Sequence, residues 1–128
     1  MDAYLQHVIA ATARAAAEAR RLGDDLSAIV AEWRQQGGIR HGSVAATIMA
    51  GLVQQPVISA ADNPATHRTD GTRPEGSTVY RALDNLVATG VLTEITDARR
   101  NRVWVATEIT AALDDFARRL GRRKKSST

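Results

Sequence analysis

The chain contains no cysteine and few aromatic residues, and both features restrict what it can be. Without cysteine it has no disulfides, no thiolate zinc sites and no thiol nucleophiles. Aromatic residues make up 4% of the chain and hydrophobic residues 44%, so aliphatic side chains must fill the core. No apolar run reaches the roughly 18 residues of a membrane-spanning helix, and the first residues lack a signal-peptide pattern. These absences predict a cytoplasmic protein that neither crosses nor binds a membrane, with one domain or one domain and an appendage.

Residue types that commonly carry catalysis or bind metals are sparse and scattered. His7, His41 and His67 lie far apart and lack neighbouring carboxylate pairs at ligand spacing. No glycine-rich phosphate loop follows an expected strand, and no Ser, His and Asp set has a recognisable context. We therefore expect no metal, no cofactor and no enzymatic activity of this chain.

Charge is unevenly distributed along the sequence, although the formal net charge is only +3. Residues 1–64 hold five Lys/Arg and six Asp/Glu, whereas residues 65–128 hold twelve and eight. A basic second half suits a domain that neutralises nucleic-acid phosphates, and it equally suits a solvated surface.

Residues 1–38 are expected to form a helical hairpin. Apolar residues recur at three- and four-residue steps from Tyr4 onward, which predicts an amphipathic helix. We expect Gly23 to end this helix, Asp24 or Asp25 to cap a second one, and the glycine pair after Trp33 to stop it. Such a hairpin is too small to fold alone, so its apolar stripes must dock on something.

Residues 39–120 are expected to form a winged helix-turn-helix domain, followed by a basic, disordered tail at 121–128. The predicted fold class is mainly α with a small β-hairpin: an N-terminal helical hairpin plus a winged helix-turn-helix. The expected elements are a helix at 43–55, a short strand or turn entering a helix capped by Ser59, a loop at 66–75, a helix at 77–89, two strands at 91–96 and 101–106 around a polar turn, and a last helix at 109–120.

The helix at 77–89 carries the functional prediction. It is amphipathic, ends at Gly90 and is followed at once by an apolar strand, which is typical of a recognition helix. Its polar face could enter the DNA major groove, which is about 12 Å wide. The alternative is an ordinary exposed helix face, because many winged helices bind proteins. The candidate DNA-binding residues on this helix are Ser77, Thr78, Tyr80, Arg81 and Asn85.

The turn between the two expected strands supplies three further DNA-binding candidates, Arg99, Arg100 and Arg102. Guanidinium groups on such a wing could hold phosphates or enter the minor groove. The alternative is a solvated turn whose charges prevent edge-to-edge pairing.

The run at 90–105 opens with Gly-Val-Leu-Thr-Glu-Ile-Thr and closes with Arg-Arg-Asn-Arg-Val-Trp-Val. It resembles the C-terminal winged helix of Fic-type proteins (filamentation induced by cAMP). The segments at 56–62 and 78–86 and the helices ending in Trp33 fit as well, so the resemblance covers nearly the whole chain. The loop at 66–75 is longer than the usual turn before the recognition helix.

Fic enzymes typically transfer AMP from ATP to a hydroxyl side chain, but their catalytic motif, H-P-F-x-x-G-N-G-R, is absent here. The resemblance therefore implies a C-terminal fragment with an artificial start at Met1, and no catalytic role passes to any residue. A weaker similarity links residues 78–83 to ferric-uptake-type repressors, whose downstream His and Cys ligands this chain lacks.

Two functions follow as expectations. The first is a DNA-binding, regulatory domain of a Fic-type protein, with double-stranded DNA and the catalytic core of the parent chain as partners. The second is a docking or dimerisation module that regulates the Fic core, or pairs two chains as a homodimer, without binding DNA. The alanine-rich N-terminal stripe favours the second, because small residues permit close helix packing.

Overall fold

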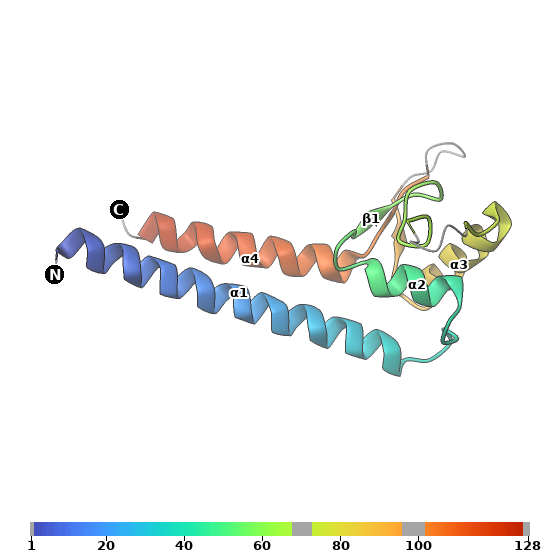
Figure 1. Ribbon diagram of the computed structural model, residues 1–128, viewed down its shortest axis with the longest axis horizontal. Coiled ribbons are helices and arrows are strands. Elements are labelled where there is room, and N and C mark those ends of the chain that lie inside the picture. Colours follow the sequence, from blue (N-terminus) through green and yellow to red (C-terminus); the bar gives the residue numbers. More distant parts are fainter. Residues whose placement is uncertain (1, 68–72, 96–101, 127–128) are drawn as a thin grey trace.

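The computed structural model describes residues 2–67, 73–95 and 102–126. It is mainly helical with a small three-stranded antiparallel sheet, which confirms the predicted fold class at this level (Figure 1). In chain order the elements are α1 (Ala3–Gln35), α2 (Val44–Gly51), β1 (Val57–Ile58), α3 (Gly76–Ala88), β2 (Thr93–Glu94), β3 (Trp104–Val105) and α4 (Thr107–Ser126).

α1 is one continuous helix of 33 residues, so the predicted hairpin within residues 1–38 is wrong. Gly23 lies in its interior, where a glycine costs only about 1 kcal/mol relative to alanine. The many alanines around it favour the helix, and packing against α4 supports it, so the local stop signal is overridden. Asp2 caps the start by accepting a hydrogen bond from the Tyr4 amide at 3.2 Å.

α4 follows directly on β3 and runs back along α1, so the two helices form a long antiparallel arm beside the rest of the molecule (Figure 1). It continues to Ser126, which makes the predicted disordered tail wrong for residues 121–126; residues 127–128 lie outside the described part. Trp33 Nε1 donates to Glu108 at 3.2 Å near the base of the arm. Arg119 Nε donates to Glu18 at 2.6 Å further along it.

The main core lies between α2, α3 and the sheet, and it includes the base of the arm. Apart from Asn63, the most deeply buried side chains are aliphatic or indole groups, as the composition predicts. In the sheet, β3 lies between the other two strands, with Trp104 opposite Ile58 on β1 and opposite Glu94 on β2. The predicted β-hairpin is therefore present as β2 and β3. Core residues within 2% exposure include Trp33, Ile48, Leu52, Leu83, Leu86, Trp104 and Ile109.

Residues 59–67 form turns, so the predicted helix capped by Ser59 is wrong. Asn63 is fully buried and holds this segment together. Its Nδ2 donates to the carbonyls of Ser59 and Ala60, both at 3.0 Å, and its Oδ1 accepts from the Ala65 amide at 2.9 Å. These side-chain bonds satisfy backbone groups that a helix would have paired, and the proline after Asn63 disfavours helical backbone there.

This turn segment also packs closely on the end of α2. A Cβ atom placed on Gly51 would lie 2.4 Å from Cβ of Pro64, so only glycine leaves room for the turn. α2 ends at Gly51 rather than at residue 55 as predicted. Among the helices in the described ranges, none combines the length and apolar character needed to cross a membrane.

Candidate nucleic-acid interface

α3 is the element that would present side chains to a nucleic acid. Val79, Ala82, Leu83 and Leu86 are buried on one face and fasten it to the core. It ends where Gly90 takes a φ of 84°, a left-handed conformation that favours glycine, so this predicted helix and its stop are confirmed. The opposite face is exposed to solvent and therefore open to a partner.

Arg81 lies at the centre of the exposed α3 face. With 3.6 residues per turn, Ser77 falls on the same line one turn earlier. Thr78 and Asn85 flank this line on one side, and Tyr80 lies on the other. Arg81 makes no hydrogen bond or ion pair with any residue that the structure describes. Nothing in the described part of the chain occupies its guanidinium group, which could therefore donate to an acceptor on a ligand.

On one side of this line, α3 meets the linker that joins α1 to α2. Asn85 is half-buried, and its Nδ2 donates to the Gly38 carbonyl at 3.3 Å, so this predicted groove contact is turned toward the linker. A pocket of about 440 Å³ opens at the junction. Arg40 from the linker and Arg81 from α3 both line it, together with Thr78.

Arg40 is a candidate that sequence reasoning missed. It is exposed and lies just before α2, whose first turn is capped by Ser43 through a 3.1 Å bond from the Ala46 amide. The only sequence signal was its position in a glycine-rich linker ahead of a helix start. The pocket therefore carries two cationic side chains from elements that are 41 residues apart in sequence.

On the opposite side of the α3 line, Arg102 is engaged within the protein. Its Nε and Nη2 donate to the two Glu94 carboxylate oxygens at 2.6 and 2.8 Å. Its guanidinium carbon lies 4.8 Å from the Trp104 ring centre and 5.6 Å from that of Tyr80. Tyr80 meets Trp104 edge to face, with ring centres 6.2 Å apart. This predicted phosphate contact and this predicted groove contact thus belong to one aromatic and guanidinium cluster.

The charges in this cluster influence one another. The hydrogen bonds from Arg102 hold the pKa of Glu94 below its ordinary value of 4.5. In return, the pKa of Arg102 is raised, chiefly by Glu94 and to a lesser extent by the charges of Asp84 and Tyr80. Because both residues are only partly buried, the pair can still exchange partners with solvent or a ligand.

The remaining predicted residues have different settings. Ser77 and Thr78 are exposed on the first turn of α3, as a groove contact requires. Arg99 and Arg100 lie outside the described residues. The structure therefore brings Ser77, Thr78 and Arg81 together on one open surface.

Titratable groups elsewhere do not assemble into a reactive centre within the described ranges. His67 Nε2 lies 2.6 Å from Asp62, and this bond, with a second from Gln55, lowers the pKa of Asp62. Among the described residues, no three His, Asp or Glu side chains gather where they could hold a metal ion.

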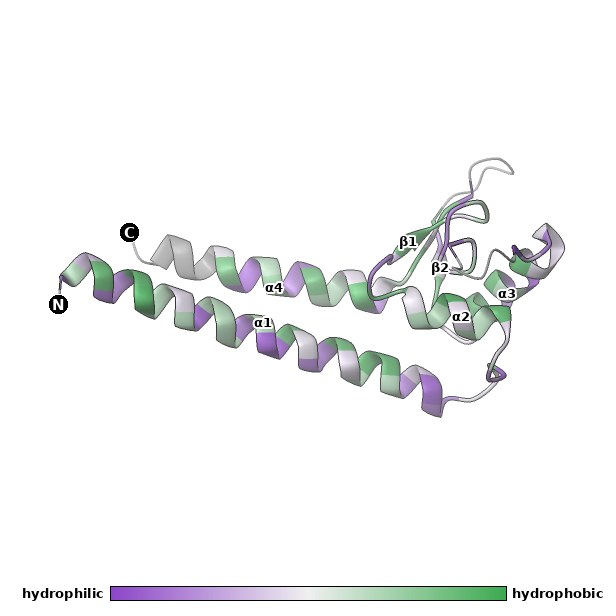
Figure 2. Ribbon diagram, viewed as in Figure 1, coloured by the Kyte–Doolittle hydropathy of each residue, from purple (hydrophilic) through white to green (hydrophobic). Residues whose placement is uncertain are grey.

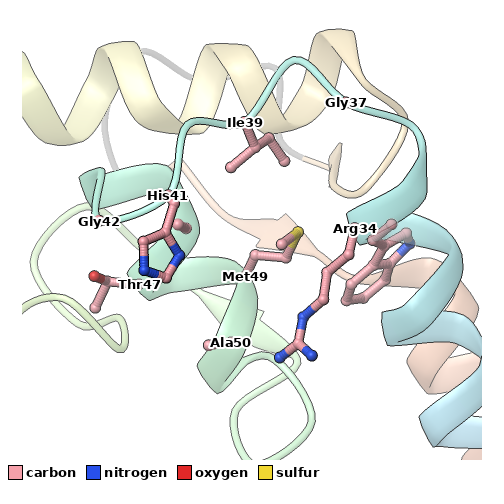
Figure 3. Close-up of a pocket in the computed structure, with 10 residues that line it drawn as sticks. Arg34, Gly37, Ile39, His41, Gly42, Thr47, Met49 and Ala50 are labelled. Carbon is pink, nitrogen blue, oxygen red and sulfur yellow. The ribbon is translucent and has the colours of Figure 1, made fainter.

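A second pocket, of about 700 Å³, lies between the end of α1, the linker and α2. Arg34 and His41 extend over its mainly apolar floor, to which Met49 contributes (Figure 3). It lies at the base of the arm, and its lining includes no residue of α3.

Comparisons with known proteins do not place the chain in a family: no family model matches it, and no curated protein matches it either.

Proposed function

We propose that the chain is the C-terminal winged helix-turn-helix domain of a Fic-type protein, that it binds double-stranded DNA through α3, and that it has a regulatory role there. The observation that carries this proposal is the exposed Arg81, which has no partner among the described residues, at the centre of an α3 face flanked by Arg40 and Arg102. A helix face of this kind fits the major groove, where guanidinium groups read guanine edges or hold phosphates.

The roles of individual residues follow from their positions. Ser77, Thr78 and Arg81 point outward from the first turns of α3, which is the part of a recognition helix that reaches base edges. Arg40 lies beside them on the linker and is suited to a backbone phosphate. The strands β2 and β3 lead into the turn with Arg99 and Arg100, which would act as the wing.

The domain would work in the cytoplasm without cofactor or chemistry of its own, and AMP transfer would belong to a parent chain.

The test is fluorescence anisotropy of a labelled mixed-sequence duplex at about 50 and 200 mM salt. A phosphate-contacting domain binds at low salt and loses affinity steeply as salt rises. Arg40→Ala should weaken binding on every sequence and reduce the salt slope by about one. Arg14→Ala, an exposed arginine on the arm, is the matched control and should change neither. An absence of binding at low salt by the folded chain would refute the proposal.

A second candidate function, protein docking, is favoured by a different observation. Large apolar side chains near the start of α1, including Tyr4 and Ile9, are exposed to solvent. Failure to bind DNA, with the chain folded, would favour a module that docks on the catalytic core of a parent protein.

A further inference from the structure

The two helices of the arm differ in length, and the longer one extends past the shorter. At 1.5 Å per residue, α1 is about 50 Å long and α4 about 30 Å. Their contacts fix the alignment: Trp33 meets Glu108 at the base, and Glu18 meets Arg119 further out. Seven residues of α4 remain beyond Arg119, so the first turns of α1 project past its end (Figure 1).

This projecting segment carries an apolar surface that the described residues leave uncovered. Tyr4, Leu5, Val8 and Ile9 are 74, 48, 39 and 52% exposed. Figure 2 shows hydrophobic positions near the free end of α1. Single exposed apolar residues are ordinary, but four on adjacent turns form a contiguous patch of the kind that marks an interaction site.

Leu5 and Ile9 of this patch begin a longer line of residues whose order is complementary to itself. Leu5, Ile9, Thr12 and Ala16 follow one another at steps of four, three and four, so they lie on one line of the helix. This spacing reads the same in both directions. When two copies pair antiparallel, Leu5 of each faces Ala16 of the other, and Ile9 faces Thr12. Large side chains then meet small ones, which is how packed helix interfaces fill space.

Charge favours the same orientation. Asp2 and Arg20 lie on the same edge of the line, about five turns apart. Antiparallel pairing brings Asp2 of one copy near Arg20 of the other at both ends of the contact. Parallel pairing in register would instead keep Asp2 of one copy about five turns away from Arg20 of the other, and it would set large residues against large ones.

We propose that two copies of this chain form a symmetric dimer by antiparallel pairing of the N-terminal halves of α1. The contact covers about five helical turns, at the lower end of specific interface sizes, so the dimer depends on protein concentration. The inference does not rest on DNA binding, and it gives the exposed end of α1 a definite partner: a second copy of itself.

Sedimentation equilibrium of the free chain, without DNA, tests the proposal from about 1 µM to about 1 mM. The mass should rise with concentration from 13.8 kDa toward twice that value. Ile9→Glu should remain monomeric throughout while keeping its helical circular dichroism. Ile95→Glu, which alters an apolar residue 60% exposed outside the arm, should dimerise normally. A chain that stays monomeric to the highest concentration, or an Ile9→Glu variant that dimerises as well as the parent, would overturn the proposal.

Cross-linking then tests the orientation, because a cysteine-free chain accepts single cysteines cleanly. In the antiparallel dimer the two copies of Leu5 lie about 16 Å apart along the axis, beyond disulfide reach. Leu5→Cys alone should therefore not cross-link, whereas a mixture of Leu5→Cys and Ala16→Cys chains should give the mixed dimer. Efficient cross-linking of Leu5→Cys with itself, and none in the mixture, would contradict the antiparallel arrangement.

Discussion

Arg102 donates two hydrogen bonds to the carboxylate of Glu94 at the turn end of the β2–β3 hairpin, and its guanidinium lies over the ring of Trp104. Glu94 therefore neutralises the charge of Arg102 at the point where the hairpin approaches α3. As long as this ion pair holds, Arg102 has less positive charge to offer to a phosphate.

Glu94→Gln should release Arg102 for DNA. Because a neutral amide binds guanidinium less strongly than a carboxylate does, we expect tighter binding and a salt slope steeper by up to about one unit. Anisotropy titrations at several salt concentrations measure both quantities. Arg102→Ala should have the opposite effect, and the double variant should match Arg102→Ala. Equal binding by Glu94→Gln and the unmodified chain would exclude Arg102 from the interface.

Acid should weaken the same pair. The pKa of Glu94 is lowered in the folded protein, so its stabilising contribution is complete above the ordinary value of 4.5. It is lost as the pH falls through the lowered pKa. Thermal melting between about pH 7 and pH 3 should therefore show a decline in Tm that is shallower in Glu94→Gln. Superimposable pH profiles of the two proteins would show that the pair contributes nothing to stability.

Arg81→Ala should reduce sequence discrimination more than general affinity. If Arg81 reads a base edge, its loss costs about 1–3 kcal/mol on the preferred site and little on a mixed-sequence duplex. The measurement is the ratio of the two Kd values, with Arg14→Ala as the control. An equal loss on both duplexes would make Arg81 a phosphate contact.

The ion pair between Arg119 and Glu18 should be essential to the arm. Both residues are less than 10% exposed, and Asp115 also accepts a hydrogen bond from Arg119. Arg119→Met removes one side of a buried ion pair, which typically costs about 3–5 kcal/mol. Urea unfolding should show this loss, and Glu18→Leu added to Arg119→Met should recover much of it. Arg118→Ala, its exposed neighbour, should stay within about 0.5 kcal/mol of the parent.

Gly51 and Gly23 should respond in opposite directions to alanine. A Cβ at Gly51 would overlap Pro64, and such overpacking costs about 1–3 kcal/mol. A Cβ at Gly23 meets nothing within 4 Å, so Gly23→Ala should stabilise α1 by up to about 1 kcal/mol. Denaturation midpoints of the two variants test this. Stabilisation by Gly51→Ala would mean that the turn at Pro64 can move away from α2 at little cost.

Local patterns in the sequence predicted the elements whose causes are local. The helix around Arg81 was predicted because its apolar stripe and Gly90 lie within the same short segment. The β2–β3 hairpin was predicted for the same reason. The contacts between distant segments were not predictable in this way: β1 pairs with β3 across 46 residues, and only that pairing completes the sheet.

The errors have related physical causes. Gly23 is a local stop signal, but α4, more than 80 residues later, supports the helix through it. Asn63 ends in a buried network with backbone carbonyls rather than in a helix. In the candidate interface, Arg40 lines the same pocket as Arg81 only because the linker folds against α3. The sequence position of Arg40 alone therefore did not indicate a role in binding. The Arg102–Glu94 pair could have been anticipated from a hairpin register with Glu94 opposite Trp104. Arg102 is two residues before Trp104, so its side chain lies on the same face and diagonally across from Glu94.

Trp33 gives the arm a mechanical property. Its side chain is only 1% exposed, and its indole nitrogen is bonded to α4, so the base of α1 is part of the same packed body as α3. A rod anchored in this way does not swing freely. Whatever holds its far end therefore fixes both the distance and the angle at which α3 is presented, and the arm acts as a spacer that sets geometry over about 50 Å.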